Sequence, residues 1–247
     1  MKSLTLSLIV FLGVALLGND SSAESLPEFR PALIGFHNRS LVNLIKTDAL
    51  MKHGQKDAVL MFSCGVDEMG NAGGARTYRE SPNANLLRDE VMARINQAQF
   101  APAVYHHFHV PVYISGTVNF FIRDGKPHLR IYLNQEEHDL MKGQDFVAPQ
   151  FACIPGNARF KGIFYPPQAP GHPGVASVRL TVDATGKVRG AKTVYEYPPN
   201  MHYGAETAGG IMDAAFIPGF RNGKPGPCEF TWSLIFGGPT RRQIKTG

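Results

Sequence analysis

Cysteines, charged residues and long apolar runs are all scarce in this chain. Only three of its 247 residues are cysteine, so a disulfide framework is excluded and the fold must depend on a hydrophobic core. Charged residues make up 18%, and although 25 Lys and Arg residues exceed 20 Asp and Glu residues, they form no basic run. We therefore expect no nucleic-acid partner.

The chain also lacks the common catalytic motifs. No Gly-x-Ser-x-Gly elbow surrounds Ser63, no His-Glu-x-x-His motif is present, and the glycine turn at Gly70–Gly74 lacks the lysine of a phosphate-binding loop. Cys64 alternates with core positions of a predicted strand, which is typical of a small buried residue rather than a nucleophile. Asp67 and Asp183 begin turns, where a short carboxylate caps backbone N–H groups. We therefore expect a non-enzymatic protein without a cofactor.

The most conspicuous polar cluster is formed by His106, His107 and His109. If this stretch is extended, His107 and His109 project to one face and could hold Zn or Cu through neutral imidazole. Zinc sites usually take three or four protein ligands, and no motif supplies the others. An exposed loop without a metal is the favoured interpretation, and a His-rich metal-binding protein is the weaker alternative.

The only long apolar run lies at the N-terminus. Leu4–Leu17 follows Lys2 and precedes the small residues Ser21–Ala23. This pattern is typical of a secretory signal peptide, here cleaved after Ala23. A spanning helix needs about 20 apolar residues, so an uncleaved membrane anchor is the alternative. We expect an exported protein that begins near Glu24.

An internal repeat is the strongest signal in the sequence. Residues 59–120 align without a gap on residues 175–236 at a constant offset of 116, with 15 identities in 62 positions. Pairs at turn and core positions include Asp67/Asp183, Gly70/Gly186, Phe100/Phe216 and Pro111/Pro227. Because the identities share one register, we infer an internal duplication.

Each copy is predicted to form a ββαβ unit. In the second copy, Val178–Val182 alternates apolar and polar residues as a half-buried strand does, and the turn at Asp183–Gly186 leads into a returning strand over Lys187–Tyr197. A helix and a last strand follow. Near the strand-ending prolines, Glu80 and Glu196 are expected to be solvated. The predicted fold class is α+β, with two tandem units that each pack a small antiparallel sheet on a helix.

The remaining segments are additions and a connector. Leu41–Lys52 has apolar residues at helical spacing, which predicts an extra helix, and Asp124-Gly125 predicts a hairpin that adds one strand to the first sheet. Six prolines between residues 135 and 174 give that region a loop-like composition. The predicted divisions are a signal peptide over 1–23, a first domain over 24–134, a linker over 135–164 and a second domain over 165–247.

Several short elements of the second copy occur in a recognisable order. They are Tyr165-Pro166, Ala169, Gly174-Val175, Val178–Gly186, Val188, Ala215–Pro218, Asn222–Pro225 and Phe230–Phe236. Together they resemble the C-terminal domain of TonB-type energy transducers, and the first copy resembles it more distantly through the repeat. A full transducer also has an uncleaved membrane helix and a long Pro-rich spacer, which this chain does not match.

The resemblance implies a periplasmic domain that binds an extended peptide segment, for example of an outer-membrane receptor, by adding it to a sheet edge. In this chain the edge would be the last strand of the second copy. The residues expected to contact the partner are Tyr165, Pro166, Glu229, Thr231, Ser233 and Ile235. The alternative is a homo-oligomeric scaffold of the cell envelope that uses the same edges.

Overall fold

The computed structural model describes residues 26–133, 146–154, 157 and 159–237. These residues form an α+β structure of mostly antiparallel sheets with few helices, as the sequence predicts. The predicted signal peptide and its cleavage after Ala23 lie outside the described residues. Within them, no helix is long and apolar enough to cross a membrane.

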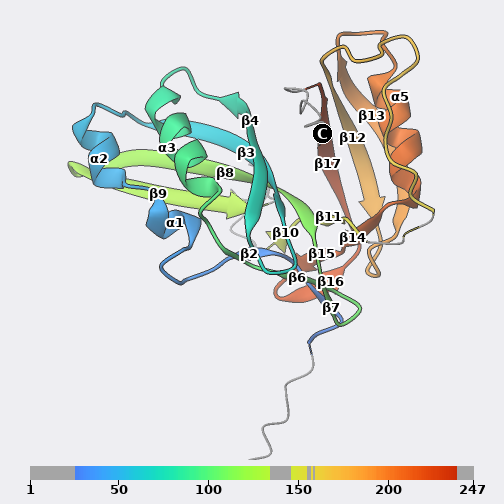
Figure 1. The fold of residues 1–247 in the computed structure, drawn as a ribbon, viewed down its shortest axis with the longest axis horizontal. Coiled ribbons are helices and arrows are strands. Elements are labelled where there is room, and N and C mark those ends of the chain that lie inside the picture. The colour runs from blue at the N-terminus through green and yellow to red at the C-terminus, as the bar shows by residue number, and fades with distance from the viewer. Residues whose placement is uncertain (1–25, 134–145, 155–156, 158, 238–247) are drawn as a thin grey trace, which may run out of the picture.

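The first half of the chain is built on a long antiparallel sheet that three helices cover on one face (Figure 1). Across the sheet the strands are β4 (Ala72–Glu80), β3 (Ala58–Val66), β8 (Val112–Arg123) and β9 (Lys126–Leu133). The helices are α1 (Leu41–Leu44), α2 (Thr47–Lys52) and α3 (Asn85–Ile95). Strand β9 confirms the hairpin predicted at Asp124-Gly125.

Helices α1 and α2 replace the single helix predicted over Leu41–Lys52. The backbone of Ile45 is extended, with φ −73° and ψ 122°, and this ends α1. The N–H of Lys46 then donates to Glu90 Oε1 of α3 at 3.1 Å. A tertiary hydrogen bond thus satisfies a backbone donor at the break, which local spacing cannot reveal.

The second half repeats the plan with three strands. Across the sheet they are β13 (Val188–Tyr197), β12 (Gly174–Val182) and β17 (Cys228–Phe236). Helix α5 (Tyr203–Gly210) covers one face and continues into the 3-10 helix η1 (Ile211–Asp213) (Figure 1). Val178, Leu180 and Val182 of β12 are fully buried on that side, as their alternation predicts.

The elements of the two halves recur at the same offset of 116 residues. Matched short strands are β6 (Ala103–Tyr105) with β15 (Gly219–Arg221), and β7 (Phe108–Val110) with β16 (Lys224–Gly226). The long strands share one register, because Ala58 lies opposite Phe120 and Gly174 opposite Phe236. Phe100 and Phe216 are both buried. These strands of the two units therefore occupy matching positions and share their registers.

A short arm precedes each unit and pairs with its small strands. In the first arm, β1 (Phe29–Arg30) pairs with β6 and β2 (Leu33–Ile34) pairs with β5 (Phe100–Ala101). In the second arm, β10 (Phe146–Val147) pairs with β15 and β11 (Gln150–Ala152) pairs with β14 (Ala215–Ile217). The registers of the two arms agree at an offset of 117 residues.

The second arm corrects the linker predicted over 135–164. Within the described part of that region, residues 146–152 belong to the second unit and correspond to the first arm. Pro149, which contributed to the loop-like composition, sits at the bend between β10 and β11. A missing backbone donor is tolerated there, because the residue lies between two short ladders. Among the described residues, strands that pair with the second unit are therefore present from Phe146 onward, within the region predicted to be a linker.

Strand β11 also joins the two units. Phe151 and Ala152 pair with Tyr113 and Val112 of β8, so one sheet runs from β14 through β11 and β8 to β4. The N–H of Cys153 extends this pairing by donating to the carbonyl of Pro111 at 2.8 Å. The short strands of both units gather at this junction (Figure 1).

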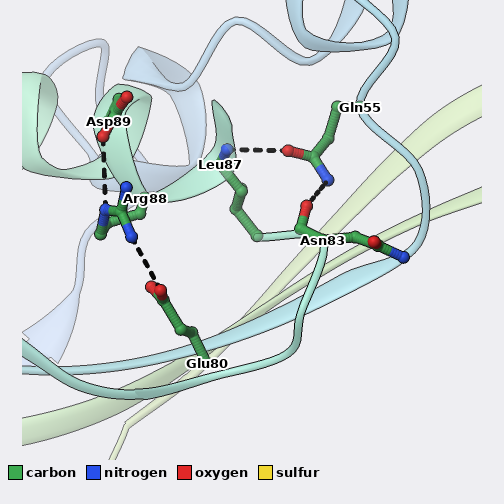
Figure 2. Close-up of polar contacts among 6 residues, drawn as sticks. All are labelled: Gln55, Glu80, Asn83, Leu87, Arg88 and Asp89. Atoms are coloured by element: carbon green, nitrogen blue, oxygen red, sulfur yellow. Dashed lines mark hydrogen bonds and ion pairs between the residues drawn. The ribbon is translucent and has the colours of Figure 1, made fainter. Parts of the chain in front are cut away.

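A buried glutamine from outside the helix holds the start of α3 (Figure 2). Gln55 is 2% exposed and its side-chain oxygen accepts the N–H of Leu87 at 2.8 Å. Its side-chain nitrogen donates to the carbonyl of Asn83 at 2.8 Å. The Ncap residue Ala84 has no side chain that could do this, so Gln55 takes over the capping.

The two glutamates predicted to be solvated also bind the helices, and Glu80 is exposed, as expected. Glu80 forms an ion pair with Arg88 of α3 at 2.7 Å (Figure 2). Glu196, its equivalent, accepts the N–H of Gly204 at the start of α5 at 2.9 Å. The Glu196 carboxylate thus lies at the N-terminal end of α5, where negative charge is favourable.

Candidate binding site at a sheet edge

In the part of the chain that the structure describes, β17 is an outer strand of its sheet. It pairs with β12 over its full length, from Cys228 opposite Val182 to Phe236 opposite Gly174, and no bulge interrupts this register. The prediction that the third strand of the second copy lies at the edge of its sheet is therefore confirmed for the described residues. Among the described residues, no second strand pairs with β17 on the side away from β12.

Odd-numbered residues of β17 direct their backbone groups away from β12. In the first unit, the N–H of Cys153, which follows β11, donates to the carbonyl of Pro111, which precedes β8 and is odd-numbered. Backbone hydrogen bonding alternates along an antiparallel strand, so the odd-numbered residues of β8 direct their N–H and C=O groups toward β11. Strand β17 has the same register on β12. The Oγ atoms of Ser233 and Ser177 lie 2.8 Å apart, which agrees with a closely spaced, non-hydrogen-bonded pair.

The predicted edge residues share this orientation. They are Glu229, Thr231, Ser233 and Ile235. Their side chains lie on the face opposite the buried Phe230 and Phe236, and Glu229 accepts a hydrogen bond from Thr181 Oγ1 at 3.3 Å. An incoming strand would therefore meet their N–H and C=O groups directly.

Strand β17 lacks the features that usually protect an edge. Register shifts interrupt the pairing of β4 and of β13 with their neighbours. The basic residues are Arg76 and Arg79 on β4, Arg189 and Lys192 on β13, and Lys126 and Arg130 on β9. Strand β17 contains no Lys, Arg, Pro or Gly, and its one charge is that of Glu229. Bulges and edge lysines or arginines discourage pairing between strands, so β17 is the edge best suited to receive one.

Tyr165 and Pro166 lie beside the far end of this strand, with different accessibility. The ring of Tyr165 contacts that of Phe236 edge-on, with centroids 5.4 Å apart, and is 38% exposed. Pro166 is buried, and its carbonyl accepts the N–H of Ala169 at 2.9 Å. Pro166 is therefore corrected from a contact residue to one that supports the loop carrying Tyr165.

Half-buried apolar groups border the edge on its core side. Trp232 and Leu234 are each partly exposed, and Trp232 packs near Phe151, with ring centroids 5.9 Å apart. Together with Tyr165 they leave apolar surface next to the backbone of β17. Such surface can bury alternate side chains of an added strand.

The histidine cluster is a turn and not an extended segment. His106 and His107 have φ values of 47° and 67°, in the left-handed region, where Asn222 and Gly223 stand in the second unit. His107 Nδ1 lies 2.7 Å from the carbonyl oxygen of Leu26. Among the described residues, no three His, Cys, Asp or Glu side chains come together as a metal site would require.

The cysteines are free, and two of the three are buried. Burial raises the pKa of the Cys64 thiol to about 12, so it is protonated and unreactive at neutral pH. The exposed Cys153 lines a pocket of about 300 Å³ at the unit junction, beside Asp67 and Tyr113. The residues that line this pocket do not form the pair of nucleophile and general base that covalent catalysis requires.

Sequence reasoning missed the two arms and their role at the junction. The available signal is the pair Phe29/Phe146, both buried at the start of an arm. Because the arms repeat at 117 residues and the units at 116, one fixed offset does not align both. Comparisons of the chain with protein-family models, with curated proteins and with solved structures found no match.

Proposed function

We propose that this protein binds an extended protein segment, which adds to β17 as an antiparallel strand. The observation that carries the proposal is the contrast between β17 and the equivalent β8. Strand β8 is covered by β9 along Gly116–Arg123 and by β11 at Val112–Tyr113, whereas β17 ends its sheet among the described residues. The repeated unit is thus suited to accept strands at this edge.

Strand β9 indicates what the segment would look like. Leu129 and Ile131 pack against the hydrophobic core, while His128 and Arg130 alternate with them on the open face. A segment on β17 would likewise need apolar residues at every second position, directed toward Trp232 and Leu234. Backbone hydrogen bonds would supply affinity and these apolar side chains would supply specificity.

The resemblance to TonB-type C-terminal domains points to the class of partner. We infer two tandem domains of this type, of which the second presents the receptive edge. The partner would then be a periplasmic segment of an envelope protein, such as an outer-membrane receptor. The equivalent registers of the two units and the edge position of β17 support this inference.

The test is a proline at Thr231, whose backbone N–H points away from β12. Thr231→Pro should keep its circular dichroism spectrum but lose partners that the wild type captures from periplasmic extract, as identified by mass spectrometry. Thr117→Pro is the control on β8, because Thr117 pairs with Tyr132 of β9, so the strand is internal there and proline should unfold the protein.

Two results would contradict the proposal. Captured partners that Thr231→Pro retains would place the binding site elsewhere, with Tyr165 the next residue to change. An unfolded Thr231→Pro would show that β17 is covered in solution. In that case Ile235→Lys, which adds a charge without removing a backbone donor, should be used to repeat the capture experiment.

A further inference from the structure

Basic side chains gather on the open face of the first sheet, which is the face away from α1, α2 and α3. Leu60 of β3 is buried in the core on the helix side, so the odd-numbered residues of β3 lie on the open face. Across the β3–β4 ladder, Arg79 lies opposite Met61 and Arg76 lies opposite Ser63. Directly opposed residues share a face, so both exposed arginines belong to the open face.

Strand β9 adds basic residues at the other side of this face. Arg130 lies opposite Asn119 of β8, which lies opposite Val59 of β3, and Lys126 lies opposite Arg123. The three basic side chains are exposed. Strands β3 and β8 lie between β4 and β9, so the two basic rows are about 14 Å apart, at about 4.8 Å for each strand spacing.

Acidic side chains do not balance the charge of this face in the described residues. Strands β3, β8 and β9 contain no Asp or Glu. The one acidic residue of β4 is Glu80, which lies opposite Leu60 on the helix side and pairs there with Arg88. Within the described part of the chain, Arg76, Arg79 and Arg130 form no ion pair.

The repeated architecture does not require this concentration of charge. In the second unit Lys192 stands at the position of Arg76, but Tyr195 stands at that of Arg79 and Glu229 adds an acidic group to the face. The basic face is therefore a property of the first unit. Since the chain has no basic run, the face forms only when the strands are brought side by side.

We propose that the open face of the first sheet binds an anionic polysaccharide, which lies along β3 and β8 between the two basic rows. The guanidinium groups of the rows bind carboxylate or phosphate groups through paired hydrogen bonds. Thr117 and Asn119 are partly exposed in the strip between the rows and offer a hydroxyl and an amide to sugar hydroxyls. Val59, which is 41% exposed, offers apolar contact to the C–H groups of a sugar ring.

A peptide strand and a nucleic acid fit this face less well. The backbone groups of β3 and β8 pair with strands on both sides, so the face presents side chains only and a peptide backbone gains no ladder there. Single-stranded nucleic acid needs open aromatic rings on which bases stack. The ring of Phe121 already stacks on His128, with centroids 5.2 Å apart, and it lies beneath Arg130.

The second unit prevents a flat membrane from covering this face. Tyr113 of β8 belongs to the open face, and Phe151 of β11 lies directly opposite it and shares that face. The ring of Phe151 contacts those of Phe216 and Trp232, with centroids 5.7 Å and 5.9 Å apart. The second unit therefore projects on the open-face side at the junction. A flexible chain can lie beside it, whereas a flat bilayer cannot.

The test measures binding of polygalacturonate, which carries one carboxylate on each sugar, to the purified full chain by calorimetry at low salt. The combined variant Arg76→Gln, Arg79→Gln and Arg130→Gln should bind weaker by about tenfold or more, because it removes the paired hydrogen bonds as well as the charge. The wild type should bind more weakly as the salt concentration rises, since exposed charges are screened. Neutral dextran should not bind.

The matched control combines Lys52→Gln, Lys187→Gln and Lys224→Gln. These lysines are exposed and lie outside the open face, so the control loses the same net charge and should bind like the wild type. Equal weakening of both combined variants would overturn the proposal, because net charge alone would then explain binding. So would a wild type that does not bind polygalacturonate.

Two further ligands test the class of partner. Tighter binding of oligothymidylate than of polygalacturonate at equal salt would overturn the proposal in favour of a nucleic acid. Tighter binding of phosphatidylglycerol vesicles would overturn it in favour of a membrane. The variants leave β17 unchanged, so either result is independent of partner binding at that strand.

Discussion

The side chain of Gln150 binds the backbone of Ala32 on both sides, accepting the N–H at 2.7 Å and donating to the carbonyl at 2.8 Å. Gln150 belongs to the arm of the second unit and is 1% exposed, and Ala32 belongs to the arm of the first unit. One amide therefore satisfies the two polar groups of a buried bend. It also connects the arms, since the residues are 118 positions apart.

Gln150→Leu should destabilise the protein by about 2–3 kcal/mol, because it leaves a buried N–H and a buried C=O without partners. Chemical denaturation measures the loss as a lower transition midpoint with an unchanged slope. Gln168→Leu is the matched control, since Gln168 is exposed and its loss should have little effect. Equal stability of the two variants would show that water replaces Gln150 at the bend.

Gly186→Ala should destabilise the second unit strongly. The glycine has φ +81°, and an added Cβ would collide with the carbonyl oxygen of Phe216. Gly125→Ala is the control, because Gly125 has a similar φ of +71° but open space around it. The control should lose only about 1 kcal/mol for the left-handed backbone, and Gly186→Ala should lose clearly more by thermal unfolding. Equal losses would mean that the turn moves to relieve the clash.

Asp183 should make stability depend on pH in the acid range. Desolvation raises its pKa, but hydrogen bonds from Thr185, Lys187 and Arg189 outweigh it and lower the pKa to about 2, from an ordinary value of 3.8. The folded state therefore binds the proton less well than the unfolded state. Its stabilisation is present above pH 3.8 and is lost as the pH falls through 2.

Asp183→Asn measures this contribution. The variant should be about 1–2 kcal/mol less stable than the wild type at neutral pH, and the difference should shrink as the pH falls from 3.8 toward 2. Arg189→Met removes only the ion pair and should have a smaller effect. A difference that does not change with pH would show that the carboxylate charge is not involved.

Thiol labelling should distinguish the three cysteines. In the native protein Ellman's reagent should modify Cys153 alone, because Cys64 and Cys228 are buried. Partial burial raises the pKa of Cys153, so its labelling should be slower than that of a free thiol. All three should react after unfolding, and Cys153→Ser should leave no rapidly reacting group. Fast labelling of Cys64 in the native state would contradict its place in the core.

Local patterns were sufficient wherever neighbouring residues determine the conformation. The alternation in Val178–Val182 predicts the buried face of β12, and the Asp124-Gly125 pair predicts the β8–β9 hairpin. The helical spacing of Leu87, Val91 and Ile95 likewise predicts the face of α3 that packs on its sheet, and all three are fully buried. In each case the period of the backbone sets which side chains share a face.

Contacts between distant segments explain the expectations that were wrong. The helix predicted over Leu41–Lys52 is divided because Glu90 of another helix accepts the N–H of Lys46. His106 and His107 form the exposed turn of a hairpin, which agrees with the favoured interpretation of an exposed loop and contradicts only the extended arrangement. Pro166, expected at the partner surface, is buried under its loop.

The sequence by itself determined the α+β class and the matching positions in its two halves, since the 116-residue offset relates turns that begin with Asp and end with Gly and relates the buried Phe100 to the buried Phe216. Tertiary structure alone decided what joins them. Residues 146–152 have the composition of a loop, and they become strands because the edges of β14, β15 and β8 supply hydrogen-bond partners that are far away in sequence. A strand forms only where a neighbouring strand supplies hydrogen-bond partners for its backbone. Strands of two or three residues therefore leave little pattern in the local sequence from which they could be predicted.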